Sequence, residues 1–273
     1  MNNVVLTLKR EPEVPVDADA LVPENFVEAP HNQICFLKLA YGNELVNLGD
    51  LFEVQGEKSD TIILNGNLQK FKNIGNGMSL GQISIYGNAG MHLGAGMKAG
   101  VIEVNGQVGD WLGAQMTGGT IIVMGSCGNM AGAAYCGEQA GMNGGSIIVY
   151  GRAGSNVGER MRRGLVIIKG EAGDFAGCMM LGGTLVLAGG CGYGVGAQMS
   201  RGSIISLEEV EILPTFHYCC TYEPVLINLL ANSISRLGLN INLAEGWAAD
   251  NYRRYMGDIT ELGKGELLVW ERS

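Results

Sequence analysis

Seven methionines recur through the middle of the chain, and every interval between them but one is 19 residues. They are Met78, Met97, Met116, Met142, Met161, Met180 and Met199. Each copy reads Met-x-x-Gly-x-Ile-x-Val-x-Gly, with small variations, and continues with further glycines three or four residues apart. A fixed period of this kind is typical of a protein that stacks copies of one small structural unit.

Inside each copy, apolar residues occupy alternate positions, as at Ile102 and Val104. Period-two alternation predicts a short strand with one buried face, and the glycines predict tight bends. An α-helical solenoid is excluded because each of these glycines would cost a helix about 1 kcal/mol. A dinucleotide-binding turn at residues 192–196 is disfavoured too, since similar glycines recur in every copy.

A unit of 19 residues cannot bury its own apolar face, so the copies must stack with equivalent strands paired in parallel. The fold class predicted is therefore mainly β: a single-stranded right-handed parallel β-helix. Seven coils spaced about 4.8 Å apart would form a rod roughly 34 Å long, with the methionines in one internal ladder.

The pattern divides the chain into three parts. Residues 1–56 lack the repeat and are predicted to cap the first coil, residues 57–207 carry the coils, and residues 208–273 form a helical and extended C-terminal part. Open ends of a coil stack would expose unpaired backbone, which is why a cap is expected.

Local patterns predict a few elements in these end segments. Strands are expected at residues 4–8, 34–39 and 267–270, and the segment from Arg253 to the last strand is predicted to contain a glycine-rich turn. A helix with its apolar residues on one side is expected at residues 225–238, after Pro224 and ending at Gly238.

The copy that begins at Met116 carries about seven extra residues, which we place at residues 133–141. An insertion in one coil should form a loop on one face, and such loops often carry function. A neutral difference in length is the equally weighted alternative.

Composition and charge exclude several classes of protein. The 44 glycines stand beside only six prolines and 47% hydrophobic residues, which excludes disorder and collagen. The net charge is −9 and basic residues cluster only at residues 160–163, so no nucleic-acid partner is expected. Neither a signal peptide nor an apolar run of spanning length is seen, which predicts a cytoplasmic protein without a membrane partner.

No group of residues predicts a catalytic, cofactor-binding or metal site. His217, Cys219 and Cys220 lie close in sequence, but adjacent cysteines rarely ligate one zinc ion and there is no Cys-x-x-Cys pair. The seven irregularly spaced cysteines are interpreted as free thiols, and those among small residues as packing groups. These are Cys127, Cys136, Cys178 and Cys191.

One alternative class remains open, a stand-alone β-helix enzyme or binding module for a polymer. Asp110, Glu159 and Asp174 occupy bends in different coils and could line one face. Aromatic residues that could stack on sugar rings also fall at bends; they are Trp111, Tyr135, Phe175 and Tyr193.

The coils and flanks together resemble a known family. The glycine-rich coils are similar to those shared by the C-terminal domain of the glutamate synthase large subunit and the C subunit of formylmethanofuran dehydrogenase. The flanks favour the latter over nearly the whole chain, and they read VVLTLK, VDADALVPENF, NLGDLFEVQG, PTFHYCCTYEPVLINLL and YRRYMGDITELGKGELLV.

The resemblance implies a non-catalytic structural subunit that binds the catalytic A, B and D subunits of the same complex. A methanofuran-type carrier and metals are then expected in those partners and no cofactor in this chain. Two relatives fit: the bacterial formyltransferase/hydrolase complex, favoured by the tail GDITELGKGELLVW, and the archaeal tungsten or molybdenum dehydrogenase. The family offers no role for residues 133–141 or for the Cys219–Cys220 pair.

Overall fold

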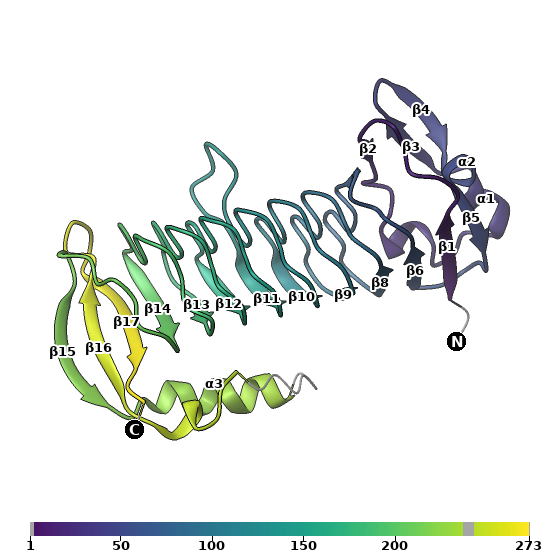
Figure 1. The fold of residues 1–273 in the computed structure, drawn as a ribbon. Helices are drawn as coiled ribbons and strands as arrows, with labels where there is room; N and C mark the ends of the chain where they lie inside the picture. Colours follow the sequence, from purple (N-terminus) through teal and green to yellow (C-terminus); the bar gives the residue numbers. More distant parts are fainter. Residues whose placement is uncertain (1–2, 237–242, 273) are drawn as a thin grey trace.

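A computed structural model describes residues 3–236 and 243–272. The chain is mainly β, and most of its strands join one 13-stranded sheet, with a second sheet of four strands near the N-terminus. Figure 1 shows a long stack of coils with a compact region at each end. The large sheet therefore runs the full length of the molecule.

The repeats supply consecutive parallel strands of the large sheet. In register, Ile102 lies opposite Ile121 and Val104 opposite Val123, so buried side chains stack on equivalent buried side chains. A second column of parallel bridges runs through Ala89, Val108 and Cys127. The repeat strands are β6 (Thr61–Asn65), β8 (Gln82–Tyr86), β9 (Val101–Val104), β10 (Thr117–Val123), β11 (Asn143–Val149), β12 (Arg163–Ile168), β13 (Thr184–Leu187) and β14 (Arg201–Ser206).

The predicted methionine ladder is confirmed, since all seven methionines are fully buried. Each coil is also bonded to the next beside its methionine: the carbonyl of Met97 accepts a hydrogen bond from the amide of Thr117 at 2.7 Å. Glycine completes this contact. A Cβ on Gly145, where φ is +85°, would lie 2.7 Å from Cε of Met116 in the preceding coil. The Met-x-x-Gly motif is therefore one packing unit divided between adjacent coils.

The N-terminal segment continues the sheet past the first coil. Strand β1 (Val4–Leu8) pairs parallel with β6 and antiparallel with β5 (Phe52–Gln55), so the predicted first strand is confirmed. The edge of the stack is thereby paired. The small sheet beside it contains β4 (Glu44–Asn47), β3 (Lys38–Tyr41), β2 (Val16–Asp17) and β7 (Phe71–Lys72), and the helices are η1 (Pro23–Asn25), α1 (His31–Cys35) and α2 (Leu48–Leu51).

The predicted strand at residues 34–39 is wrong in its first half. Pro30 is extended and precedes the single helical turn α1, which buries Ile34 and closes with a hydrogen bond from the amide of Phe36 to the carbonyl of Asn32. A Pro with fixed φ before a short polar run favours such a turn. The strand starts only at Lys38.

The C-terminal segment closes the other end of the stack. Strand β17 (Lys264–Trp270) pairs parallel with β14, which bears out the predicted final strand. Strands β16 (Tyr252–Gly257) and β15 (His217–Tyr222) then extend the sheet in antiparallel order. The turn predicted before the last strand is found at residues 259–262, but the residues from Arg253 that precede it belong to strand β16, which was not predicted and which pairs with β17 on one side and β15 on the other.

Helix α3 (Val225–Arg236) confirms the predicted helix over its described part; Leu237 and Gly238 lie outside the described residues. With η2 (Trp247–Ala249) it covers the outer face of the last coils, below the strands in Figure 1. The outward positions there are apolar and fully buried, at Ile148, Ile167, Val186 and Ile205, whereas earlier coils place Ser84 and Glu103 outward. Strands buried on both faces carry such continuous apolar runs.

No helix within residues 3–236 and 243–272 combines the length and the apolar character that crossing a membrane requires.

Replacing Met116 with Ala should lower the free energy of unfolding by about 2–5 kcal/mol, because it leaves a cavity in the ladder. Met124→Ala is the matched control, since Met124 is 50% exposed, and should change it by less than about 0.5 kcal/mol. Urea unfolding measures both changes in free energy, provided that the slope of the free energy against urea concentration, m, is the same in each variant. Equal losses in the two variants would contradict a structural role for the ladder.

Candidate functional surfaces

The extra residues after Met116 form a loop that projects between β10 and β11, as predicted (Figure 1). The loop is tied at its base to the next coil. The amide of Ala134 donates to the carbonyl of Glu159 at 3.2 Å, and the amide of Gly141 donates to the carbonyl of Arg160 at 2.9 Å. The Arg160 guanidinium also donates to the carbonyl of Glu138 at 3.1 Å, so the loop has a defined position.

One side chain of the loop, Tyr135, contacts the bends of earlier coils. Its hydroxyl lies 2.9 Å from Nδ1 of His92, and His92 stacks on Trp111 with ring centroids 5.3 Å apart. His92 and Trp111 occupy equivalent bend positions, both with positive φ. Trp111 and Tyr135 also line an adjoining depression of about 260 Å³. This aromatic cluster fixes the loop on the stack.

The surroundings of the cluster make His92 a weaker base than an exposed imidazole. Burial, and then the charge of Lys72, lower the pKa of His92, against the opposing effects of Asp17 and Asp110. Burial raises the pKa of the Tyr135 hydroxyl. Both groups are therefore neutral near pH 7, and the imidazole contacts a phenol rather than an orienting carboxylate. His92 is partly buried because Tyr135 reaches it.

The acidic residues considered for polymer cleavage do not converge. Asp110 accepts a hydrogen bond from the amide of Asn129 at 2.7 Å, and Asp174 accepts one from the amide of Tyr193 at 2.9 Å. Three coil steps, about 14 Å, separate these two aspartates. That distance exceeds the roughly 5–9.5 Å between the carboxyl groups of glycosidases. Glu159 lies 3.8 Å from the Arg160 guanidinium.

The thiols divide into buried and exposed groups. Burial raises the pKa of Cys127 and Cys191 to about 12 and that of Cys178 to about 11, so these thiols stay protonated and unreactive at neutral pH. Cys136, expected to be a packing group, is instead exposed because it lies on the projecting loop. Cys219 and Cys220 are exposed on the edge strand β15. Within residues 3–236 and 243–272 no group of three or more His, Cys, Asp or Glu side chains could hold a metal ion.

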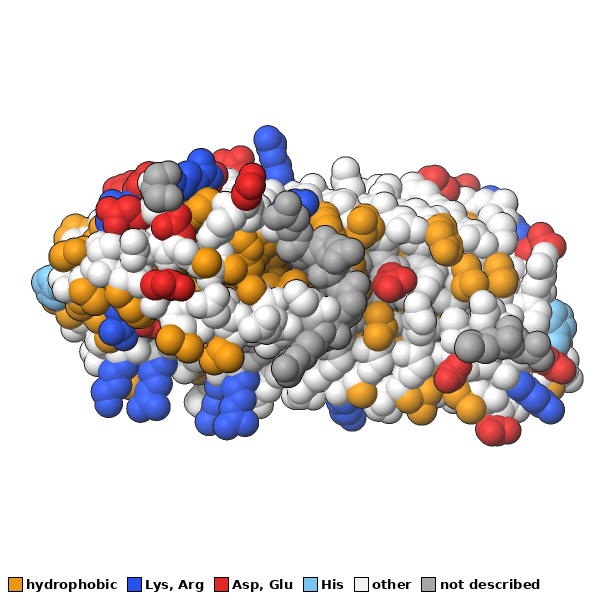
Figure 2. Space-filling view, turned by 90° about the horizontal axis from the view of Figure 1, so that it is seen from below, with side chains coloured by type: hydrophobic (Ala, Val, Ile, Leu, Met, Phe, Trp, Pro, Cys, Tyr) orange, Lys and Arg blue, Asp and Glu red, His pale blue; other side chains and the backbone are white. Residues whose placement is uncertain are grey.

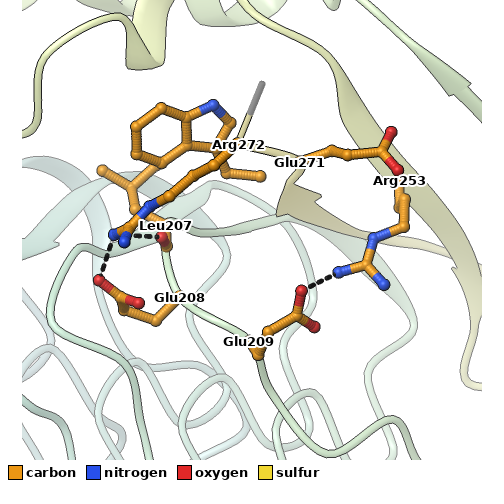
Figure 3. Close-up of a pocket in the computed structure, with 7 residues that line it drawn as sticks. Leu207, Glu208, Glu209, Arg253, Glu271 and Arg272 are labelled. Carbon is orange, nitrogen blue, oxygen red and sulfur yellow. Dashed lines mark hydrogen bonds and ion pairs between the residues drawn. The ribbon is translucent and has the colours of Figure 1, made fainter.

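A depression of about 340 Å³ lies where the last coil meets the C-terminal strand (Figure 3). Glu209 pairs with Arg253, and Glu208 pairs with Arg272, whose guanidinium lies 5.0 Å from the centre of the Trp270 ring. The charges are thus largely paired within the chain. This arrangement ties the end of the chain to the last coil and leaves few groups free for a ligand.

The C-terminal part carries an exposed apolar surface. The apolar side chains of α3 were expected on one side, but they divide: Ile227, Leu230 and Ile234 pack on the sheet, whereas Val225 and Leu229 are 72% and 59% exposed. Figure 2 shows apolar side chains gathered on this side of the molecule. Clusters of exposed apolar residues are typical of interaction surfaces. Helical spacing could have predicted this division, because Val225 and Leu229 lie on a different face of the helix from Ile227 and Ile234.

We expect wild-type protein to lose more stability than His92→Asn as the pH falls from about 7.5 to about 5.5. Because the pKa of His92 is lowered on folding, the unfolded chain binds the proton more readily and low pH favours it. Asn tolerates the positive φ at this bend. Thermal unfolding across pH measures the effect; His31→Asn, at an exposed histidine, is the control. Identical slopes for wild type and His92→Asn would contradict it.

No family model matches the chain. Among curated proteins it is similar to the C subunit of tungsten-containing formylmethanofuran dehydrogenase 2 from Methanothermobacter marburgensis, at 39% identity over 98 residues, 34% of this chain and 36% of that protein. It is 35% identical over 98 residues to the C subunit of molybdenum-containing formylmethanofuran dehydrogenase 1 from Methanosarcina barkeri, covering 34% of this chain and 33% of that protein. The chain thus spans about a third of the length of these curated relatives.

A solved structure matches almost the whole chain. It is the crystal structure of the formyltransferase/hydrolase complex (FhcABCD) from Methylorubrum extorquens in complex with methylofuran. One of its chains superimposes with a TM-score of 0.91 and 35% sequence identity, over 98% of this chain and all of that one. Together with the names of the curated relatives, this match shows that the chain belongs to the family of formylmethanofuran dehydrogenase C subunits.

Proposed function

We propose that the chain is the non-catalytic structural subunit of a formyltransferase/hydrolase complex. The observation that carries the proposal is the match, over 98% of the chain, to a component of the FhcABCD complex. In this proposal the complex transfers a formyl group from formyl-tetrahydromethanopterin to a methanofuran-type carrier and releases formate. The carrier and any metals are held by the partner A, B and D subunits, and the complex works in the cytoplasm.

Two features of the chain support a structural role. The coils place acidic side chains in bonds between neighbouring bends, as at Asp110 and Asp174, and bury the thiols of Cys127 and Cys178. Parallel pairing without interruption from β6 to β14 supports a stiff body, which we propose is a right-handed parallel β-helix. Nearly all parallel crossover connections are right-handed.

A second candidate is the C subunit of the tungsten or molybdenum formylmethanofuran dehydrogenase. The names of the curated relatives favour it, although those alignments cover only about a third of the chain. A stand-alone enzyme acting on a polymer is the candidate of another class. It is less well supported because Asp110 and Asp174 lie about 14 Å apart and their carboxylates bind backbone amides.

The proposal is tested by co-expressing the tagged chain with the source organism's homologues of the other FhcABCD subunits. We expect all of them to co-purify with the chain in fixed ratios. Formate should be released from formyl-tetrahydromethanopterin by the assembled complex and not by the chain alone. Failure of the other subunits to bind, or turnover by the chain alone, would overturn the proposal.

The same preparation separates the two family candidates. A hydrolase complex should release formate without an electron acceptor, whereas a dehydrogenase must pass two electrons to one when it oxidises the formyl group. Tungsten or molybdenum in the purified complex, together with turnover that depends on an added acceptor, would favour the dehydrogenase.

A further inference from the structure

Basic side chains without partners gather at one edge of the stack, although the chain as a whole has a net charge of −9. Arg162, Arg163 and Arg201 surround a depression of about 460 Å³, together with Leu181 and Leu262. Lys264 lies directly beside Arg201 in the parallel register of β14 and β17. We call Arg162, Arg163, Arg201, Lys264, Leu181 and Leu262 the arginine surface.

The register explains why the surface is hollow. Arg163, residue 182 and Arg201 take the same position in three successive coils, and residue 182 is glycine. Neighbouring coils are about 4.8 Å apart, so the two arginines stand about 10 Å apart with no side chain between them. This gap separates the two arginines that border the depression, and Leu262 borders the depression from the turn before β17.

The basic side chains of this surface are exposed and make no ion pair or hydrogen bond with any part of the chain that the structure describes. Other arginines are paired, as Arg253 is with Glu209 and Arg254 with Glu266. Like charges on neighbouring strands destabilise a sheet. Placing Lys264 directly beside Arg201 therefore works against folding, and an anionic partner would reverse that effect.

From these observations we infer that the arginine surface docks an acidic segment of a partner subunit. The inference rests on the proposed function, because it assumes that the chain works in a complex. Arginine binds carboxylates through two parallel hydrogen bonds, and it is enriched at protein interfaces. The side chains of Leu181 and Leu262, 36% and 58% exposed, provide apolar contacts beside these charges.

The residues that line the depression favour a protein segment over a phosphate group as the ligand. Phosphate sites use free backbone amides, but here the amides of Arg162, Leu181 and Ser200 already donate to the methionine carbonyls of the preceding coil at 2.8–2.9 Å. Guanidinium, ammonium and apolar side chains, with the hydroxyl of Ser200, remain to contact a ligand. Acidic residues interleaved with apolar ones match that set. Figure 2 shows Lys and Arg side chains standing out along one edge near the C-terminal end of the stack.

The test uses the co-expressed complex with the tagged chain carrying Arg163→Glu and Arg201→Glu together. We expect recovery of the partner subunits to fall at least 10-fold, and binding by wild type to weaken as salt is raised. The matched control is Arg10→Glu with Arg152→Glu, the same change of charge at exposed arginines elsewhere, which should recover the partners as wild type does. Arg163→Lys with Arg201→Lys should give intermediate recovery, since it keeps the charge and loses the paired bonds.

A melting temperature measured for each variant separates lost binding from lost folding. Removing the repulsion beside Lys264 should leave the melting temperature of Arg201→Gln unchanged or raise it by about 1–2 °C, while recovery of the partners falls. If wild type and both charge-reversal variants recover the partners equally, the inference fails and the proposed function stands. If wild type recovers none, the proposed function itself fails. A chain that pairs with a second copy of itself through this surface would also overturn the inference.

Discussion

The structure depends on the contact between a methionine in one coil and the glycine that follows the next methionine. The methionine's terminal methyl occupies the space that a Cβ would need, and its carbonyl accepts a hydrogen bond from the next coil. The two halves of this contact belong to different copies of the repeat, so no coil is complete alone. Burial and backbone pairing therefore arise together as coils stack, which is the cooperative behaviour expected of solenoids.

The repeat made the coils predictable from sequence because it combines three local signals: alternating apolar residues, periodic glycine and periodic methionine. The predicted helix at its described residues and the first and last strands were also found. The turn α1 was missed, since the short apolar run from Ile34 to Leu37 fits a buried strand equally well until Pro30 is taken as the start of a helical turn. Strand β16 was missed because it lies outside the repeat and its sequence, YRRYMG, lacks the alternation of apolar and polar residues that marks the coil strands; its pairing with β15 and β17 supplies what the pattern does not.

The surfaces were harder to predict than the core, for a physical reason. The position of a core side chain follows from its place in the repeat. Tyr135, by contrast, contacts His92, which lies 43 positions earlier, and the arginine surface combines residues from coils separated by tens of residues. In the sequence, only the outward-facing positions of the strands indicated which part of the surface is covered. They change from Ser84 and Glu103 to Ile148 and Ile167 where α3 covers the sheet. Clustering of arginine at residues 160–163 was visible, but its neighbours were not.

The closed ends of the coil stack fix its length. Strand β1 pairs with the first coil strand, β6, and β17 pairs with the last, β14, so neither coil strand has a free edge on which a further coil could pair. Everything displayed on the sides, including the projecting loop and the covering helix, is then spaced in whole coils of about 4.8 Å. Distances between such features can change only by gain or loss of a complete 19-residue unit. The spacing of surface features along the stack is thus set by backbone pairing between coils and not by the side chains that the coils present.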